Sequence, residues 1–298
     1  MKVVVLGANG LVGSRIATRL FEGGDEVFAV ARGPQRLDAR VHYMGGIDLL
    51  RDTSRVGEII ASVRPDGVIS AAAMTDVDAC EEKPAEAWTL NVEAVEVAAR
   101  ACAQTRARFT TLSTDYVFDG VKGSYSEEDV ANPRGIYART KRAGEEAALI
   151  RGEGAAVCRV AVVYSGFPAL KPTFAVTAAD ALRAGKPVKA FTDQVVSPTL
   201  ADNAAEMVIG VHRSGEAGIF HCAGATEISR IDFCRAIARK LGADPSLIVP
   251  VQLADLRLPA PRPLRCGLRV DKVKRLLGAD VPLPLDAALD RFFAERAR

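Results

Sequence analysis

Short apolar runs alternate with longer stretches of helical periodicity through the first 165 residues of the chain. The apolar runs are rich in valine and do not alternate with polar residues, which is typical of strands covered on both faces. They predict strands at 3–6, 27–31, 67–72, 109–113 and 156–163. The longer stretches predict helices at 11–21, 55–63, 85–105 and 138–151. This alternation favours βαβ units, and therefore an α/β fold with a doubly wound parallel sheet.

Beyond residue 165, glycine and proline interrupt the pattern more often. Helical periodicity persists at 175–184, 202–212, 231–241 and 285–297. We expect residues 1–165 to form a Rossmann-type domain that also receives later segments, roughly 188–215. Residues 166–298 then form mainly a smaller, interleaved C-terminal α/β domain, which we expect to bind the substrate.

A glycine-rich turn follows the first predicted strand. Gly7, Gly10 and Gly13 stand in G-x-x-G-x-x-G spacing around the start of the first helix. Such glycines allow a tight turn, close approach of the backbone to a pyrophosphate, and close packing of helix and strand. The pattern predicts that residues 1–165 bind NAD(P), and the alternative is an ordinary glycine-rich turn. The expected contacts from the turn are Gly7, Asn9, Gly10, Leu11 and Val12.

The residue at the end of the second predicted strand indicates which dinucleotide binds. NAD-binding domains place a carboxylate about 20 residues after the glycines, where it binds the ribose 2′-hydroxyl. Here Arg32 holds that position, and a guanidinium suits a 2′-phosphate. The sequence therefore favours NADPH, with NADH as the alternative, unless Arg32 is only a solvated turn residue. Asp48 and Leu49 stand where they could meet the adenine, although Asp48 could equally cap the next helix.

Tyr137 and Lys141 are four residues apart in a predicted helix, so both project from one face. A phenol has an ordinary pKa of about 10, and a neighbouring ammonium lowers it. Such a pair can donate a proton to a carbonyl oxygen, although the same spacing also occurs on surface helices. Thr114 lies at the end of the fourth strand, where doubly wound sheets bind ligands. Its hydroxyl could polarise the carbonyl, with Ser113 as the competing residue because adjacent strand residues face opposite ways.

Composition excludes several classes of protein. The chain has 298 residues, and 39 Lys and Arg against 37 Asp and Glu give a net charge of +2. This charge is too small for a general nucleic-acid binder. The content of 49% hydrophobic and 26% charged residues excludes disorder. The six cysteines form no C-x-x-C pair, and the three histidines do not join them in a zinc pattern, so we expect buried thiols and no metal.

The N-terminal run and the hydropathy pattern indicate the cellular setting. The apolar run at 3–6 is too short for the core of a signal peptide, and glycines interrupt it. A membrane-spanning helix needs about 18 or more consecutive apolar residues, and the sequence has no such run. We therefore expect a soluble, cytoplasmic protein.

Longer segments add to these motifs. They are A-A-A-M-T-D-V-D at 71–78, Asn91, S-T-D-Y-V-F-D-G at 113–120 and Y-A-R-T-K at 137–141. Together they resemble the extended short-chain dehydrogenase/reductase superfamily, and within it the dTDP-4-dehydrorhamnose reductase family. The resemblance covers nearly the whole chain, and its most specific part is 113–120. It implies reduction of a 4-keto-6-deoxy sugar nucleotide with NADPH, and a homodimer is compatible with it.

The resemblance also implies roles for the matching residues. Tyr137 would donate the proton, Lys141 would bind the nicotinamide ribose and lower the tyrosine pKa, and Thr114 would hold the ketone. Further cofactor contacts would come from Ala71, Ala72, Ala73 and Asn91, and Asn91 would also be the helix asparagine that supports the site. Substrate contacts would come from Thr75, Asp115, Tyr116 and Val117.

Two departures from the family pattern concern the sugar side. Residues 159–164 lack the tryptophan that family members often carry there, and Thr173 and Phe174 replace an Asn-Phe pair. These changes remove stacking and hydrogen bonding for a sugar nucleotide. Two other functions therefore stay open. One is a non-catalytic, NADP-binding regulatory subunit similar to the β subunit of methionine adenosyltransferase, and the other is an epimerase or dehydratase of the same superfamily.

Overall fold

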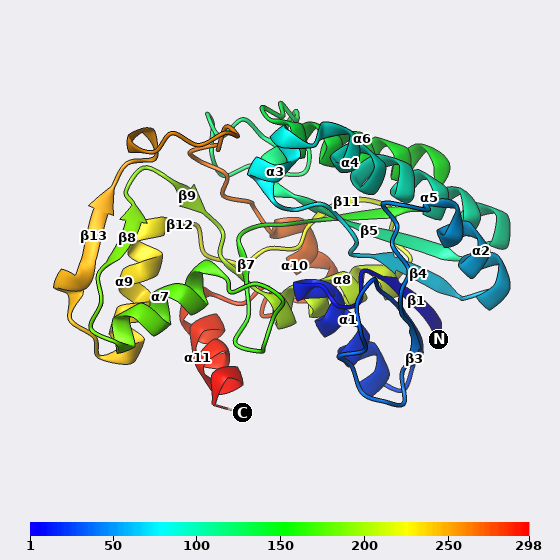
Figure 1. Cartoon of the computed structure of the whole chain (residues 1–298), viewed down its shortest axis with the longest axis horizontal. Helices are drawn as coiled ribbons and strands as arrows, with labels where there is room; N and C mark the ends of the chain where they lie inside the picture. Colours follow the sequence, from blue (N-terminus) through cyan, green and yellow to red (C-terminus); the bar gives the residue numbers. More distant parts are fainter. Residues whose placement is uncertain (298) are drawn as a thin grey trace.

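The strands predicted in the first half of the chain lie together in a seven-stranded sheet whose neighbours are all parallel. The computed structural model describes residues 1–297 (Figure 1). The strand order is β11-β6-β5-β4-β1-β2-β3, so the winding of the chain reverses between β1 and β4. The strands are β1 (Lys2–Leu6), β2 (Glu26–Val30), β3 (His42–Met44), β4 (Gly67–Ser70), β5 (Arg108–Thr114), β6 (Ala156–Val160) and β11 (Gly218–His221). The doubly wound, Rossmann-type sheet is confirmed.

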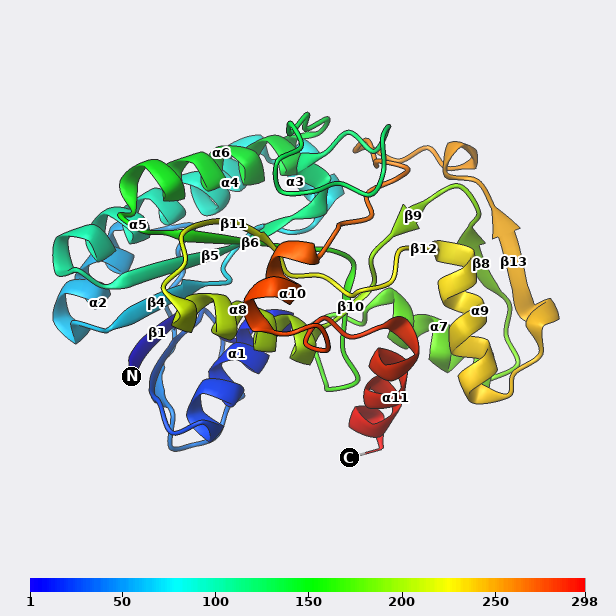
Figure 2. The same cartoon turned by 180° about the vertical axis from the view of Figure 1, so that it is seen from behind.

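Helices cover both faces of this sheet, which explains why its strands lack an alternating pattern (Figures 1 and 2). In β1, Val3 and Val5 enter one hydrophobic cluster while Val4 and Leu6 enter another, and all four are buried. The first cluster packs against α1 (Leu11–Glu22), α8 (Ala201–Ser214) and α10 (Asp271–Leu277). The second packs against α2 (Ser54–Val63), α5 (Ala94–Thr105) and α6 (Ile136–Arg151).

A second lobe stands beside the sheet, at the left of Figure 1. It pairs β8 (Val188–Phe191) with β13 (Ile248–Val251) and has its own hydrophobic cluster around Tyr164, Phe233 and Phe292. Its helices are α7 (Phe174–Arg183), α9 (Arg230–Leu241) and α11 (Leu285–Arg296). Short strands complete it: β7 (Val163–Tyr164) pairs with β10 (Thr199–Leu200), and β9 (Val195–Val196) with β12 (Ile228–Ser229).

The segment 188–215, predicted to contribute to the Rossmann-type domain, divides between the two lobes. β8 pairs with β13 in the second lobe, and only α8 packs against α1. The late strand that joins the sheet is β11, which lies just beyond the predicted segment and pairs with β6. A four-residue edge strand has too short a pattern to be recognised from sequence alone. The domain boundary near residue 165 stays a prediction.

The helix predicted at 85–105 is divided. The chain forms α3 (Val77–Glu82), α4 (Pro84–Trp88), a π-helical turn over Thr89–Glu93, and then α5. Single π turns inside helices are often found at functional sites. Here the turn carries Asn91, and α6 packs so closely on it that a Cβ at Gly144 would collide with the Asn91 carbonyl oxygen. Tertiary packing therefore changes the winding of a helix that composition alone predicts to be regular. Short 3₁₀ turns lie at Asp115–Val117, Pro245–Leu247 and Leu253–Asp255.

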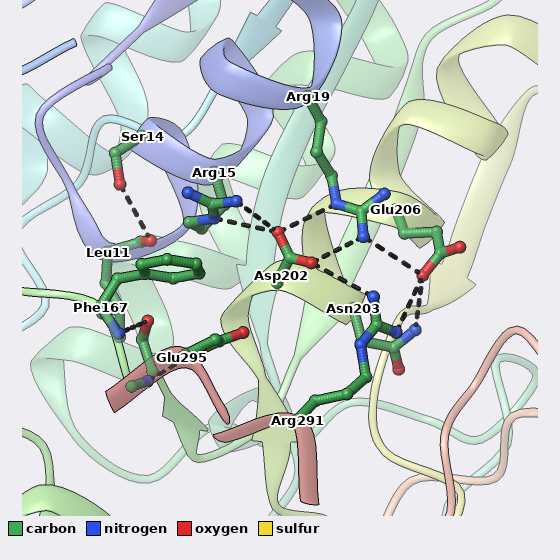
Figure 3. Close-up of polar contacts among 12 residues, drawn as sticks. Leu11, Ser14, Arg15, Arg19, Phe167, Asp202, Asn203, Glu206, Arg291 and Glu295 are labelled. Atoms are coloured by element: carbon green, nitrogen blue, oxygen red, sulfur yellow. Dashed lines mark hydrogen bonds and ion pairs between the residues drawn. The ribbon is translucent and has the colours of Figure 1, made fainter. Parts of the chain in front are cut away.

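A buried carboxylate connects the two lobes (Figure 3). Asp202, at the start of α8, accepts hydrogen bonds from Arg15 Nε at 2.9 Å and Arg19 Nη2 at 2.6 Å, both on α1. Arg291 of α11 approaches the same carboxylate with Nη2 at 3.3 Å. The guanidinium of Arg15 also stacks on Phe167, 4.1 Å from the ring centroid. Asp202 thus holds the helix after the glycine turn against the C-terminal helix.

Replacement of Asp202 by asparagine should lower the free energy of unfolding by about 2–3 kcal/mol, because three guanidinium groups lose a partly buried partner. Burial acts to raise the pKa of Asp202, but the hydrogen bonds from Arg19 and Arg15 outweigh it and hold the pKa below its ordinary value. This contribution is therefore complete above the unfolded pKa of about 4 and is lost at lower pH. Urea titrations of the two proteins should accordingly converge below about pH 4. A pH-independent difference would contradict this assignment, and Glu206→Gln, at a 38% exposed side chain, is the milder control.

Candidate active site

A cleft of about 400 Å³ lies where the winding of the sheet reverses, beyond the carboxyl ends of β1 and β4. Doubly wound sheets bind ligands at this point. The cleft is lined by Gly7, Asn9, Gly10, Val30, Ala31, Arg32, Gly33, Pro34, Arg36, Ile47, Asp48, Leu49, Ala71, Ala72, Ala73, Leu90 and Leu170. Most of the residues predicted to bind the cofactor are among them.

The glycine turn has the geometry that a dinucleotide requires. Gly7 has a φ of +77°, and a Cβ there would lie 2.7 Å from the Ala72 nitrogen. A Cβ at Gly13 would collide with the Gly7 carbonyl oxygen, so helix α1 can approach the turn only because residue 13 is glycine. No side chain caps the N-terminus of α1, which leaves its first N–H groups free for an anion. Asn9 also lines the cleft, and its buried Oδ1 has no hydrogen-bond partner among the described residues.

Arg32 and Arg36 bring two cations to the wall of the cleft. The Arg32 side chain is 73% exposed, and its Nη1 lies 4.0 Å from Asp48 Oδ2. Asp48 also accepts a hydrogen bond from the Leu50 nitrogen at 3.2 Å, so it both lines the cleft and caps a local turn. An exposed guanidinium held this loosely is free to pair with a phosphate. The geometry therefore fits NADPH.

Replacement of Arg32 by alanine should weaken NADPH binding by about 10-fold or more, because a charge-assisted pair with the 2′-phosphate is lost. NADH lacks this phosphate, so its dissociation constant should change by less than about twofold. Fluorescence titration with both dinucleotides measures the difference. Arg51→Ala is a matched control, since Arg51 lies 3.8 Å from the same Asp48 but is 87% exposed and outside the cleft lining. Equal weakening of both dinucleotides by Arg32→Ala would contradict the 2′-phosphate role.

Three predicted cofactor residues lie elsewhere than expected. Leu11 borders a neighbouring hollow between the glycine turn and residues 165–170, and Val12 is buried in the core below α1. Only the backbone of Val12 is therefore placed to meet a ligand. Asn91 is fully buried, and its amide bonds the backbone of Met74 and the Thr140 hydroxyl. Its side chain consequently supports the active-site segments, and its role as a cofactor contact stays a prediction.

The predicted catalytic residues converge at the carboxyl end of β5, next to the cleft. Helix α6 begins at Ile136, whose backbone nitrogen donates to Glu81 Oε1 at 2.7 Å, so α3 anchors the start of α6. Tyr137 is buried there, beside the Thr114 hydroxyl at the end of β5. One turn further on, Lys141 Nζ donates to the Leu112 carbonyl at 2.7 Å. Of the two hydroxyls considered, the structure thus places Thr114 next to the phenol, while Ser113 Oγ is buried without a partner.

The pKa values of Tyr137 and Lys141 are not shifted as the sequence predicted. Burial raises the pKa of Tyr137 above its ordinary value, and the Thr114 hydroxyl opposes this. Burial also lowers the pKa of Lys141 to about 8, against the influence of Glu145. Lys141 contacts a backbone carbonyl and not the phenol, so the expected lowering of the tyrosine pKa by Lys141 is not seen. Tyr137 is therefore held as a protonated phenol, the form that can donate a proton.

The four residues predicted to bind the substrate differ in their burial and in their contacts. Asp115 is buried beside Thr114, which donates to its Oδ1 at 3.0 Å, and burial raises the pKa of this carboxyl to about 7. The Tyr116 ring meets Tyr137 edge-on, 5.9 Å between centroids. Thr75 is exposed between β4 and α3. Val117 is fully buried in the hydrophobic core, so only its backbone is left to contact a substrate, and its role stays a prediction.

Two residues near the site were missed from the sequence. Leu170 lines the cofactor cleft although it belongs to the glycine- and proline-rich connection to the second lobe. Arg230, the first residue of α9, lies within electrostatic reach of Asp115 and Tyr116. Neither belongs to a motif with a mechanism. Both come from outside the Rossmann-type domain, so only the tertiary structure brings them to the site.

Three further predictions concern the cysteines, metals and membranes. All six cysteines are free and buried, as predicted. Within residues 1–297, the acidic, histidine and cysteine side chains form no group of three or more that could hold a metal ion. None of the helices described is both long and apolar enough to span a bilayer.

Comparison with known proteins gives a consistent result. The model of the family described as "RmlD substrate binding domain" matches residues 1–297. A probable low-salt glycan biosynthesis reductase from Haloferax volcanii is 36% identical, with 99% of each chain covered. A dTDP-4-dehydrorhamnose reductase from Mycobacterium tuberculosis is 35% identical over 88% of this chain and 82% of its own. The crystal structure of a dTDP-4-dehydrorhamnose reductase from Clostridium acetobutylicum covers 100% of both chains, with a TM-score of 0.87 and 28% identity.

Proposed function

Because this chain belongs to the RmlD substrate binding domain family, we propose that it catalyses the NADPH-dependent reduction of a 4-keto-6-deoxy sugar nucleotide. Relatives that match most of its length are named dTDP-4-dehydrorhamnose reductase, which favours a dTDP-linked substrate. The observation that carries the proposal is the position of Thr114, Tyr137 and Lys141. They meet at the carboxyl end of β5, one strand from the cleft that fits a dinucleotide.

The residues of the site divide the chemistry among them. Bound NADPH supplies the hydride for the ketone carbon. The Thr114 hydroxyl would bind the ketone oxygen, and the Tyr137 phenol beside it would donate the proton that completes the alcohol. Lys141, one turn further along α6, would bind a ribose hydroxyl of the cofactor. Tyr137 and Lys141 are both buried, which excludes water from the proton transfer.

The proposal is tested by NADPH consumption in the presence of dTDP-4-keto-6-deoxy sugars. Absorbance reports the oxidation of NADPH, and chromatography identifies the reduced sugar nucleotide. UDP-linked and dTDP-linked substrates compared side by side show whether the nucleotide matters. Tight NADPH binding without turnover of any keto sugar would support a regulatory subunit instead. A sugar nucleotide converted with no net loss of NADPH would support an epimerase or dehydratase.

Two finer points belong to the same proposal. We propose that the protein works in the cytoplasm and forms a homodimer. Light scattering after size-exclusion chromatography measures the molar mass of the particle, and fractionation of the source cells locates the protein.

A further inference from the structure

An unpaired cation lies at the boundary between the two lobes. The Nε of Arg230 is buried without a hydrogen-bond partner, and its guanidinium forms no ion pair with any of residues 1–297. Burying a charge without a partner is costly, so buried cations are normally paired. Arg262 follows this rule, since its Nη2 lies 2.6 Å from Asp78 Oδ2. Arg230 therefore stands out as a cation without a partner among residues 1–297.

The position of Arg230 is set by rigid elements. Its backbone nitrogen donates to the Gln194 carbonyl at 2.9 Å, directly after the pairing of β12 with β9. Its guanidinium stacks on the ring of Phe174, 4.2 Å from the centroid. Stacking on an aromatic face orients a planar guanidinium without using its N–H groups. The Phe174 ring thus orients the Arg230 side chain and leaves its N–H donors free to bind a ligand.

Arg230 lies within electrostatic reach of the residues at the carboxyl end of β5. Tyr116, Asp115 and Cys234 are the groups whose charge acts on it, and the Tyr116 ring meets that of the proposed proton donor Tyr137 edge-on. Asp115 also has an unpartnered oxygen, Oδ2, yet the two groups form no ion pair. The Nε of Arg230 in the second lobe and the Oδ2 of Asp115 in the first therefore both lack a hydrogen-bond partner near the proposed catalytic residues. A ligand that carries both an anion and hydroxyl groups would satisfy both.

Resting on the proposed function, we infer that Arg230 binds the diphosphate of the sugar nucleotide while Asp115 accepts a hydrogen bond from a sugar hydroxyl. A guanidinium is well suited to a diphosphate because its fork of N–H donors matches two phosphate oxygens. Arg230 belongs to the second lobe, whereas the glycine turn for the cofactor lies in the first. The substrate diphosphate and the cofactor pyrophosphate thus have separate partners.

The test compares Arg230→Gln and Arg230→Lys with Arg235→Gln, a 53% exposed arginine on the same helix. Calorimetry measures binding of dTDP, thymidine and NADPH to each folded protein. Arg230→Gln should weaken dTDP about 10- to 100-fold, leave thymidine and NADPH within about twofold, and raise KM more than it lowers kcat. Arg230→Lys should recover part of the affinity because it keeps the charge. Arg235→Gln should match the wild type.

Thermal unfolding separates binding from a structural role. Removal of an unpaired, half-buried cation should leave the melting temperature unchanged or raise it, whereas loss of a structural arginine lowers it. Unchanged dTDP affinity in Arg230→Gln, or equal losses of affinity for dTDP and NADPH, would overturn the inference. Turnover of a keto sugar nucleotide by the wild type would still uphold the proposed function. If no keto sugar nucleotide were reduced but dTDP affinity still depended on Arg230, the proposed function would fail and the inference would stand. A wild type that binds neither dTDP nor UDP would overturn the inference.

Discussion

Replacement of Tyr137 by phenylalanine should lower kcat by at least about 100-fold while the dissociation constant of NADPH changes by less than about twofold. General acids contribute about 10²- to 10⁴-fold to rate, and this substitution removes only the hydroxyl that carries the proton. The ring stays, so its packing against Tyr116 and the small cluster around Cys80 is kept. Stopped-flow measurement of NADPH oxidation, together with titration of the cofactor, separates the two quantities.

The matched control is Tyr125→Phe. Tyr125 is also buried, but its hydroxyl donates to Asp119 at 2.7 Å, away from the proposed catalytic residues. Its loss should reduce stability and leave kcat within about threefold of the wild type. Near-normal turnover by Tyr137→Phe would show that the proton comes from another group, and the role given to the phenol would be wrong.

Replacement of Glu145 by alanine should lower the free energy of unfolding by about 3–5 kcal/mol, because it leaves a buried guanidinium without its counter-ion. Arg159 on β6 donates to both carboxylate oxygens of Glu145, with each of the two distances 2.7 Å. The side chains are 2% and 0% exposed, so water cannot replace the lost partner. Glu145 lies on α6, so this pair also fixes the helix of Tyr137 and Lys141 against the sheet. Denaturant unfolding followed by circular dichroism measures the loss.

The neighbouring Glu146 provides the control. Its side chain is 55% exposed and pairs with Arg142 at 2.9 Å, so Glu146→Ala should cost less than about 1 kcal/mol. A double variant in which apolar residues replace both Glu145 and Arg159 should recover much of the stability, since no charge is then left unpaired. Equal effects of the two glutamate substitutions would contradict the role of the buried pair.

The Rossmann-type half of the molecule was predictable because its signals are local. A run such as 3–6 is apolar at every position, and the structure shows why: alternate residues enter hydrophobic clusters on opposite faces of the sheet. Gly7 is required by a positive φ and by close approach of Ala72, constraints that act within one βα turn. The position of Tyr137 four residues before Lys141 likewise follows from helix geometry alone.

Packing between distant segments decided what the sequence could not show. The sequence places Val117 in a specific motif, but the turn after β5 buries its side chain in the core. Asn91 is part of the same resemblance, yet its amide is used by Met74 and Thr140. The sequence pattern of 188–215 predicts strands and helices but not which strands pair. In the structure β8 pairs with β13, outside the main sheet.

By itself, the sequence determined the parallel sheet, the dinucleotide turn and the one helix face that carries the phenol and the ammonium, because periodicity and glycine spacing act over a few residues. Only the tertiary structure decided which charges are paired. Glu145 pairs with Arg159, and Asp202 pairs with the arginines of α1. Arg230 stays unpaired although it lies within electrostatic reach of Asp115. Pairing between residues far apart in the chain depends on how the lobes pack, and no local pattern encodes it.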